Sequence, residues 1–239
     1  WLGNALKGNL GQSHYLNSPV SEVIFTRLPV TMILGASALS FGLLLAIPLG
    51  VLAAMRPNTL IDRFALGLAV IGQALPSFWF ALIMIFFFGV ALRWLPITGS
   101  DSWLNFVMPS IALGYYITPA VMRLTRAGMI EVLSSDYIRT ARAKGLRPSI
   151  VLFKHALRNA IIPVVSLAAV QFGFMLGGSI VIETIFAING LGQLAWESIL
   201  RADLPMMQAI VLVLSCFYII LTLVADILNA FLDPRIRVS

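Results

Sequence analysis

The chain has 239 residues, of which 59% are hydrophobic and 11% are charged, and its formal net charge is +6. Soluble domains carry about 25% charged residues, so this composition excludes an ordinary soluble protein and indicates a membrane protein. In such a protein, excess basic charge reports membrane topology more than ligand type, and we expect no nucleic-acid binding. The single cysteine, Cys216, lies in an apolar run and cannot form an internal disulfide.

Five windows without Asp, Glu, Lys or Arg are long enough to cross a bilayer core of about 30 Å as helices. The sequence therefore predicts an all-α, polytopic helix bundle, in which an extracytoplasmic arm (1–27) precedes a transmembrane domain (28–239). Because the chain begins at Trp1 without a signal segment, we expect a sixth span to precede these five in the complete protein. Pro76 and Pro163 are candidate kinks that shape a cavity or hinge. The predicted spans are 28–55, 64–92, 102–122, 159–182 and 204–225.

The distribution of lysine and arginine predicts the orientation of the bundle. If successive loops lie on alternate sides of the membrane, one side holds three times as many basic residues as the other. Because cytoplasmic loops carry an excess of lysine and arginine, we expect the more basic side to be cytoplasmic. This places the arm outside and the C-terminus inside the cell. The predicted cytoplasmic residues are Arg56, Arg63, Arg123, Arg126, Arg139, Arg142, Lys144, Arg147, Lys154, Arg158, Arg235 and Arg237, and the predicted outer ones are Lys7, Arg27, Arg93 and Arg201.

The predicted cytoplasmic loop, residues 123–158, contains a short basic helix. Asp136 is a suitable N-cap, residues 137–144 favour a helix, and Gly145 suits the left-handed residue that ends one. Leu133, Tyr137 and Ala141 share one helix face. Small alanines allow close approach of a partner and arginines can pair with its carboxylates, whereas the alternative is a solvated or lipid-binding loop. The candidate coupling residues are Asp136, Tyr137, Arg139, Thr140, Ala141, Arg142, Ala143, Gly145 and Leu146.

At these residues the chain resembles the inner-membrane permease subunits of binding-protein-dependent ABC importers. Their general signature is Glu-Ala-Ala, three residues, Gly, nine residues and Ile-x-Leu-Pro, of which Ala141, Gly145 and Leu157 match here. The variant Arg-Thr-Ala-Arg-Ala-Lys-Gly (139–145), followed by His-Ala-Leu-Arg-Asn-Ala, is similar to the dipeptide and oligopeptide branch, which also includes nickel and glutathione permeases. Further segments that fit this branch are Leu95-Pro, Gly-Leu-Gly at 190–192, Asp-Leu-Pro-Met-Met-Gln at 203–208 and Asp-Pro-Arg at 233–235.

The resemblance implies a transport subunit of a bacterial inner membrane that is not an enzyme. Its implied partners are a second homologous permease, two ATPase subunits that bind ATP and Mg²⁺, an extracytoplasmic substrate-binding protein and membrane lipid. The chain has no Gly-x-x-x-x-Gly-Lys-Ser/Thr loop, and we expect no cofactor within it. Di- and oligopeptides are the first expectation for the cargo, with nickel complexes and glutathione left open.

Uncharged polar residues within the predicted spans are the candidates for a substrate pathway, although the same residue types also join membrane helices. They are Gln73, Ser77, Ser166 and Gln171. The five windows hold no ionisable Asp, Glu, Lys or Arg, which disfavours the alternative of an ion-coupled carrier. His14 and His155 lie outside the windows and give no sign of a metal site.

Overall fold

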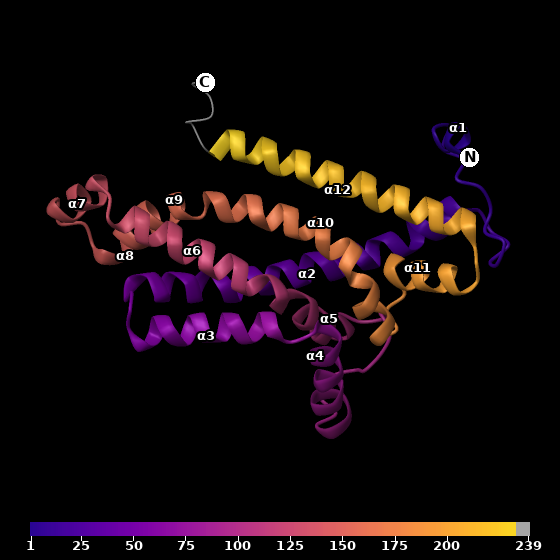
Figure 1. Cartoon of the computed structure of the whole chain (residues 1–239), viewed down its shortest axis with the longest axis horizontal. Helices are drawn as coiled ribbons and strands as arrows, with labels where there is room; N and C mark the ends of the chain where they lie inside the picture. Colours follow the sequence, from indigo (N-terminus) through magenta and orange to yellow (C-terminus); the bar gives the residue numbers. More distant parts are fainter. Residues whose placement is uncertain (233–239) are drawn as a thin grey trace. The chain divides into compact units, whose positions relative to one another are not determined.

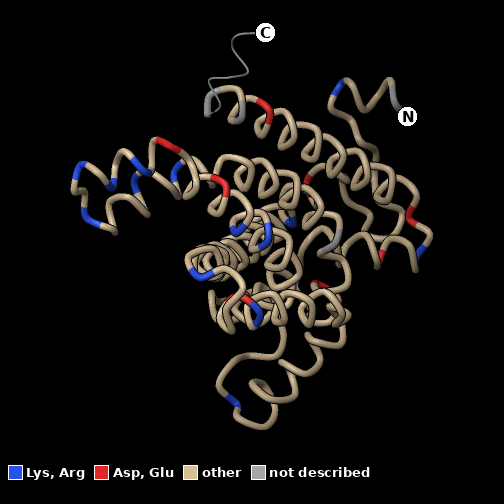
Figure 2. The backbone as a smooth tube through the Cα atoms, turned by 60° about the vertical axis from the view of Figure 1, so that its left-hand side comes forward, with Lys and Arg blue, Asp and Glu red and all other residues tan. Residues whose placement is uncertain are grey.

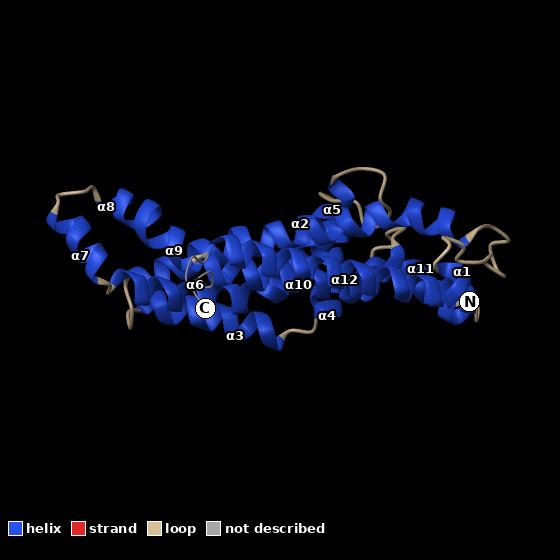
Figure 3. Cartoon of the chain, turned by 90° about the horizontal axis from the view of Figure 1, so that it is seen from above, coloured by secondary structure: helices blue, strands red, loops and turns tan. Residues whose placement is uncertain are grey.

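The computed structural model describes residues 1–232, and all their regular elements are helical (Figure 3). Arg235, Arg237 and the segment 233–235 of the sequence analysis lie outside the described residues. The helices, labelled in Figure 1, are α1 (Leu2–Ala5), α2 (Val20–Met55), α3 (Leu60–Ala74), α4 (Ser77–Met84), η1 (Ile85–Ala91), α5 (Leu104–Gly114), η2 (Tyr115–Ile117), α6 (Thr118–Leu133), α7 (Asp136–Ala143), α8 (Pro148–Ile150), η3 (Val151–Leu157), α9 (Arg158–Ala160), α10 (Ile162–Ile185), α11 (Leu191–Leu200) and α12 (Leu204–Leu232).

Three helical stretches are long and apolar enough to cross a membrane, namely Val20–Met55, Leu104–Leu133 and Leu204–Leu228. The number rises to five if each of two interrupted pairs counts as one span. These pairs are Leu60–Ala74 with Ser77–Ala91, and Pro148–Ala160 with Ile162–Gly177. The polytopic all-α class is confirmed, while the number of spans stays a prediction.

The helices differ from the predicted windows at several boundaries. The first is the start of α2 at Val20, which lies within the predicted arm, residues 1–27. The window 64–92 is not one helix, because Leu75 and Pro76 have extended backbones and separate α3 from α4. The helix predicted to end at residue 122 continues through α6 to Leu133. The three charged residues of this extension, Arg123, Arg126 and Glu131, did not end the helix, because a helix needs its backbone hydrogen bonds satisfied but tolerates charged side chains.

Proline positions explain several helix boundaries. Pro119, Pro163 and Pro205 each lie in the first turn of a helix, where the missing N–H would have no partner in any case. The interruption before α10 therefore falls at Ile161, and Pro163 begins the new helix instead of bending an existing one. The helix directions change by 51° at this break and by 99° at the break that contains Pro76, so a bend is present beside each of the two prolines; their role as a cavity wall or hinge stays a prediction.

The chain divides into two compact units. The first comprises residues 1–39, 76–114 and 172–221, and the second comprises residues 40–75, 115–171 and the segment from 222 onward. In the first unit, the fully buried Val20, Leu191 and Met206 join the start of α2 to α11 and α12. In the second unit, Ala53, Ala65 and Val121 join α2, α3 and α6 through small side chains.

Candidate functional site

The basic helix predicted from the sequence is present as α7, and Ser135 is its N-cap. Ser135 has an extended backbone (φ −73°, ψ 152°), whereas Asp136 is already the first helical residue. The prediction that Asp136 caps the helix was therefore wrong by one position. The Asp136 carboxylate instead accepts a hydrogen bond at 3.0 Å from Arg139 Nη1, one turn later, and both side chains are exposed. An acidic residue in the first turn still suits the positive end of the helix dipole.

A Schellman turn ends α7 at Gly145. Its φ is +74°, in the left-handed region that favours glycine. The N–H of Gly145 donates to Arg142 O (2.9 Å) and the N–H of Leu146 donates to Ala141 O (3.4 Å). These two bonds are the pair that defines this motif. The chain then reverses and Pro148 opens α8.

The inner face of α7 is formed by Ile138 and Ala141. Both belong to one buried apolar cluster that also contains Met129 of α6 and Val151 of η3. The predicted face of Leu133, Tyr137 and Ala141 was therefore only partly right, because Tyr137 remains 45% exposed. Ala141 packs within its own chain, so its small size serves internal packing and is not available to a partner.

A polar contact fixes α7 from its other side. Asn159 of α9 donates through Nδ2 to the Tyr137 hydroxyl (2.9 Å) and to the carbonyl of His155 (3.1 Å). The sequence analysis did not single out Asn159, because its partner lies 22 residues away and no local pattern connects them. Asn159 thereby ties the start of the basic helix to the segment that leads into α10.

The outer face of α7 is exposed and positively charged. Figure 2 shows basic residues gathered along α7 and the turn to α8. Between residues 136 and 158 the only acidic residue is Asp136. The exposed members of the predicted coupling set are Asp136, Tyr137, Arg139, Thr140, Arg142, Ala143, Gly145 and Leu146. Such a surface can bind carboxylates of a protein partner through arginine side chains.

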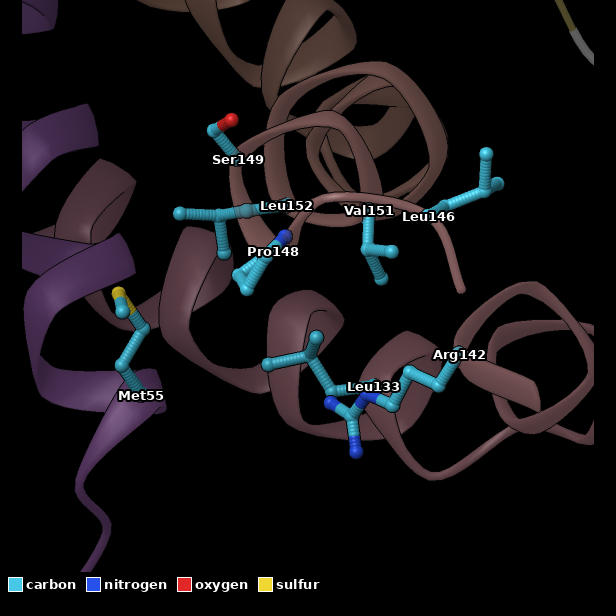
Figure 4. Close-up of a pocket in the computed structure, with 8 residues that line it drawn as sticks. All are labelled: Met55, Leu133, Arg142, Leu146, Pro148, Ser149, Val151 and Leu152. Atoms are coloured by element: carbon cyan, nitrogen blue, oxygen red, sulfur yellow. The ribbon is translucent and has the colours of Figure 1, made fainter. Parts of the chain in front are cut away.

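An open pocket of about 500 Å³ lies between α6, α7 and the α8–η3 segment. Figure 4 shows Arg142 beside Leu133, across the pocket from Pro148 and Leu152. The remaining lining residues are Met55, Leu146, Ser149 and Val151. The mostly apolar lining, with one guanidinium at its edge, makes the pocket an extension of the same exposed surface.

Close helix packing holds α6, which leads into α7. A Cβ on Gly50 of α2 would lie 2.7 Å from Met122 O, and one on Gly128 would lie 2.9 Å from Ala160 O. Both distances are too short for any larger residue, so glycine permits α2 and α9 to approach α6. Because α7 follows α6 directly, it is attached to a closely packed group of three helices, α2, α6 and α9.

Buried ionisable groups were underestimated from the sequence. Asp62, 2% exposed, accepts hydrogen bonds from Arg126 Nε (2.6 Å) and Nη2 (2.7 Å). Glu183, which directly follows the predicted span 159–182, lies instead within α10 and is fully buried. Its carboxylate accepts bonds from Thr31 Oγ1 (2.8 Å), Ser179 Oγ (2.8 Å) and the Gln193 N–H (3.0 Å).

The four predicted pathway residues occupy different settings. Gln73 is exposed near the end of α3, and its Oε1 accepts a hydrogen bond from Arg123 Nη1 at 3.1 Å. The Ser166 hydroxyl donates at 3.4 Å to the carbonyl of Ile162 in its own helix. Ser77 is the first residue of α4, and Gln171 is half-buried in α10. Their role in a pathway stays a prediction.

The described chain is thus an all-helical protein with stretches long and apolar enough to cross a membrane and with an exposed basic helix, α7. Residues 46–238 match the family described as binding-protein-dependent transport system inner membrane component. The glutathione transport system permease protein GsiC of Pectobacterium atrosepticum is 41% identical over 237 residues, which cover 99% of this chain and 78% of that protein. The protein of the same name from Escherichia coli strain K12 is 40% identical over 237 residues, which also cover 99% of this chain and 78% of that protein.

Solved structures give a consistent fold. A chain of the inward-facing MetNI methionine ABC transporter superposes with a TM-score of 0.73 at 19% identity, covering 88% of this chain and 96% of that one. An amino acid ABC transporter gives a TM-score of 0.61 at 18% identity, with 90% and 94% covered. This chain belongs to the family of binding-protein-dependent transport system inner membrane components. It is a permease subunit of an ABC importer, and separate ATPase subunits carry out ATP hydrolysis.

Proposed function

We propose that this chain forms the translocation pathway of an ABC importer for glutathione. The observation that carries the proposal is identity of about two residues in five over nearly the whole chain to permeases named for glutathione transport. Glutathione is a tripeptide with two carboxylates and one amino group, so it falls within the chemistry expected for a peptide-transporting branch. Other short peptides are the second candidate, and nickel complexes the third.

The test of the cargo is ATP-dependent uptake in proteoliposomes that hold the full complex and its binding protein. Radiolabelled glutathione is the tracer, with a dipeptide and a nickel complex as competitors. Saturable uptake that unlabelled glutathione displaces, and the dipeptide and nickel do not, supports the proposal. If a labelled dipeptide is taken up and glutathione is not, the cargo is a dipeptide and the glutathione proposal is wrong. Uptake that does not depend on ATP would contradict import driven by ATP.

We further propose that α7 is the element that contacts the ATPase subunits. Its inner face packs in the chain's own core through Ile138 and Ala141, which leaves the outer face free for a partner. Rigid attachment to α6 and α9 would transmit movement of the ATPases to the bundle as a rigid-body shift. In this proposal the ATPases bind ATP and Mg²⁺, a second permease completes the pathway, and lipid surrounds both. In the same proposal, residues 123–158 and the C-terminus lie in the cytoplasm, and the N-terminal arm, which precedes α2 as residues 1–19, lies outside.

Charge reversal tests this contact. Arg142→Glu removes a guanidinium from the outer face of α7, and we expect the ATPase subunit to be lost during purification of the complex. Lys154→Glu is the matched control, because it makes the same change of charge on exposed η3, outside α7. Equal retention of the ATPase by both variants would contradict a role for the outer face of α7.

A further inference from the structure

Arg123 is an exposed arginine within an apolar helical stretch. It lies in α6, inside the Leu104–Leu133 stretch that is long and apolar enough to cross a membrane. Its Nη1 donates to Gln73 Oε1 at 3.1 Å. The two ion pairs found among residues 1–232 join other side chains, Arg126 with Asp62 and Arg139 with Asp136. The guanidinium of Arg123 is thus bound to a neutral amide and to no carboxylate of the described chain.

The two arginines of α6 reach opposite ends of α3. Arg126 binds Asp62 in the first turn of α3, whereas Arg123 binds Gln73 next to its last residue, Ala74. Asp62 and Gln73 are eleven residues apart, which corresponds to about 16 Å along a helix. Arg123 therefore points away from the end of α3 that carries Asp62, and toward the break at Leu75. The sequence analysis had placed Arg123 at the edge of a cytoplasmic loop.

The backbone around this end of α3 is held in place by a second contact. The hydroxyl of Tyr115, in η2, donates to the carbonyl of Leu75 at 2.6 Å, directly after α3 ends. A Cβ on Gly72 would make ordinary contact at 3.5 Å with Pro119 of α6. The end of α3 is therefore packed against the segment that opens α6, and Gln73 presents its amide to Arg123 from a fixed position.

The Arg123 guanidinium is exposed and is bound to a neutral amide, so it keeps donors that a negatively charged ligand can use. Arginine has five N–H donors in a planar fork that matches a carboxylate, and the bond to Gln73 occupies one of them. We infer that Arg123 and Gln73 form a binding site for a carboxylate of the transported substrate. The inference rests on the proposed function, because it needs a cargo such as glutathione or a peptide that carries a free carboxylate.

The test compares uptake with ATP hydrolysis in proteoliposomes that hold the complete complex, the binding protein and labelled glutathione. For Arg123→Gln we expect the ratio of uptake to binding-protein-stimulated hydrolysis to fall about tenfold, because charge-assisted hydrogen bonds to the carboxylate are lost. Arg123→Lys keeps the charge and should lose less. Arg63→Gln, the same change at an exposed arginine in the first turn of α3, should leave the ratio unchanged.

A second variant, Gln73→Glu, tests the same site even if Arg123→Gln does not fold. Gln73→Glu puts a carboxylate in place of the amide whose oxygen lies 3.1 Å from Arg123 Nη1. The new carboxylate should occupy Arg123 internally and reduce the ratio to a similar degree, while the ion pair supports folding. A ratio within twofold of the wild type in Gln73→Glu would overturn the inference. Loss of the second permease on purification of Arg123→Gln would also overturn it, by assigning Arg123 to a subunit contact. So would a dependence on anionic lipid that only the wild type shows, since Arg123 would then bind a lipid phosphate.

Failure of the site and failure of the cargo give different results. If wild-type complex takes up no glutathione but does take up a labelled dipeptide, the cargo proposal fails and the same ratios are measured with the dipeptide. If wild-type complex takes up glutathione and Arg123→Gln does so equally well per ATP hydrolysed, the cargo proposal stands and the carboxylate site is wrong.

Discussion

Asp62 and Arg126 form a two-point ion pair that joins the first turn of α3 to the middle of α6, with N···O distances of 2.6 and 2.7 Å. The Asn58 N–H adds a third hydrogen bond to the same carboxylate at 2.8 Å. The carboxylate side chain is 3% exposed and the arginine side chain 22%. Because α6 leads directly into α7, this pair sets the position of the proposed ATPase-binding helix relative to α3.

Removing one charge of this pair should destabilise the protein. Asp62→Asn leaves Arg126 partly buried without a counter-charge, and breaking a buried ion pair in this way costs about 3 kcal/mol or more. We expect a lower unfolding temperature for the detergent-solubilised complex, measured by tryptophan fluorescence. Asp136→Asn is the control, because it breaks an ion pair whose side chains are 77% and 94% exposed and which contributes little. Equal unfolding temperatures for Asp62→Asn and the wild type would contradict this role.

Local patterns in the sequence were sufficient to predict α7. Its start, its end and the left-handed Gly145 depend on residues within one or two turns, so helix propensity and capping rules apply directly. The partners of α7 could not be predicted in the same way. Asn159 binds Tyr137 across 22 residues and Arg126 binds Asp62 across 64, and side-chain pairs at such separations leave no periodic pattern.

Glu183 shows why charge alone misplaced a helix boundary. A window free of charged residues ends at Ile182, but α10 continues to Ile185 because Thr31 and Ser179 satisfy the carboxylate. A buried charge is tolerated where hydrogen bonds replace water, and such bonds become visible only in the folded chain.

Substitution of Gly145 should separate backbone strain from side-chain crowding. A Cβ at this position would meet nothing within 4 Å, so the cost of adding a Cβ here comes from φ +74°. That cost is about 1–2 kcal/mol for a residue with a Cβ, and it should shift Leu146 and weaken retention of the ATPase subunit. Gly145→Asn should be milder, because asparagine tolerates the left-handed region. If valine and asparagine retain the ATPase equally, the Schellman turn does not position the coupling surface.

The Gly190-Leu-Gly192 segment permits α11 to begin directly against α10. A Cβ on Gly192 would lie 2.7 Å from the Cα of Ile180, a backbone atom that cannot move aside alone. We therefore expect Gly192→Ala to destabilise the protein by about 1–3 kcal/mol, as overpacking does, with a matching fall in unfolding temperature. Gly67→Ala is the control, since a Cβ there meets nothing within 4 Å and alanine favours the helix by about 1 kcal/mol. A fall of the same size in both variants would refute the steric explanation.

The N-terminal arm should detach from α12 in acid. Burial acts to raise the pKa of Asp203, but hydrogen bonds from the Ser13 hydroxyl and from the N–H groups of Tyr15, His14 and Met206 outweigh it and hold the pKa below the ordinary value of 3.8. A carboxylate with a lowered pKa stabilises the folded state above its unfolded pKa and loses that contribution as pH falls through the folded one. The arm should therefore stay anchored at pH 5–8 and loosen only below about pH 4.

Limited proteolysis with pepsin between pH 2 and 5 would measure this release, by the rate at which residues 1–19 are cleaved from the complex. The side-chain amide of Asp203→Asn does not titrate between pH 2 and 5. The arm of this variant should therefore be cleaved at a rate that follows only the activity of pepsin, as measured on an unrelated substrate. The wild type should show an additional increase in cleavage as pH falls, because protonation removes an acceptor that Ser13 and two backbone N–H groups of the arm share. Identical pH profiles for the wild type and Asp203→Asn would show that the arm is held by apolar contacts of Leu10 and its neighbours instead.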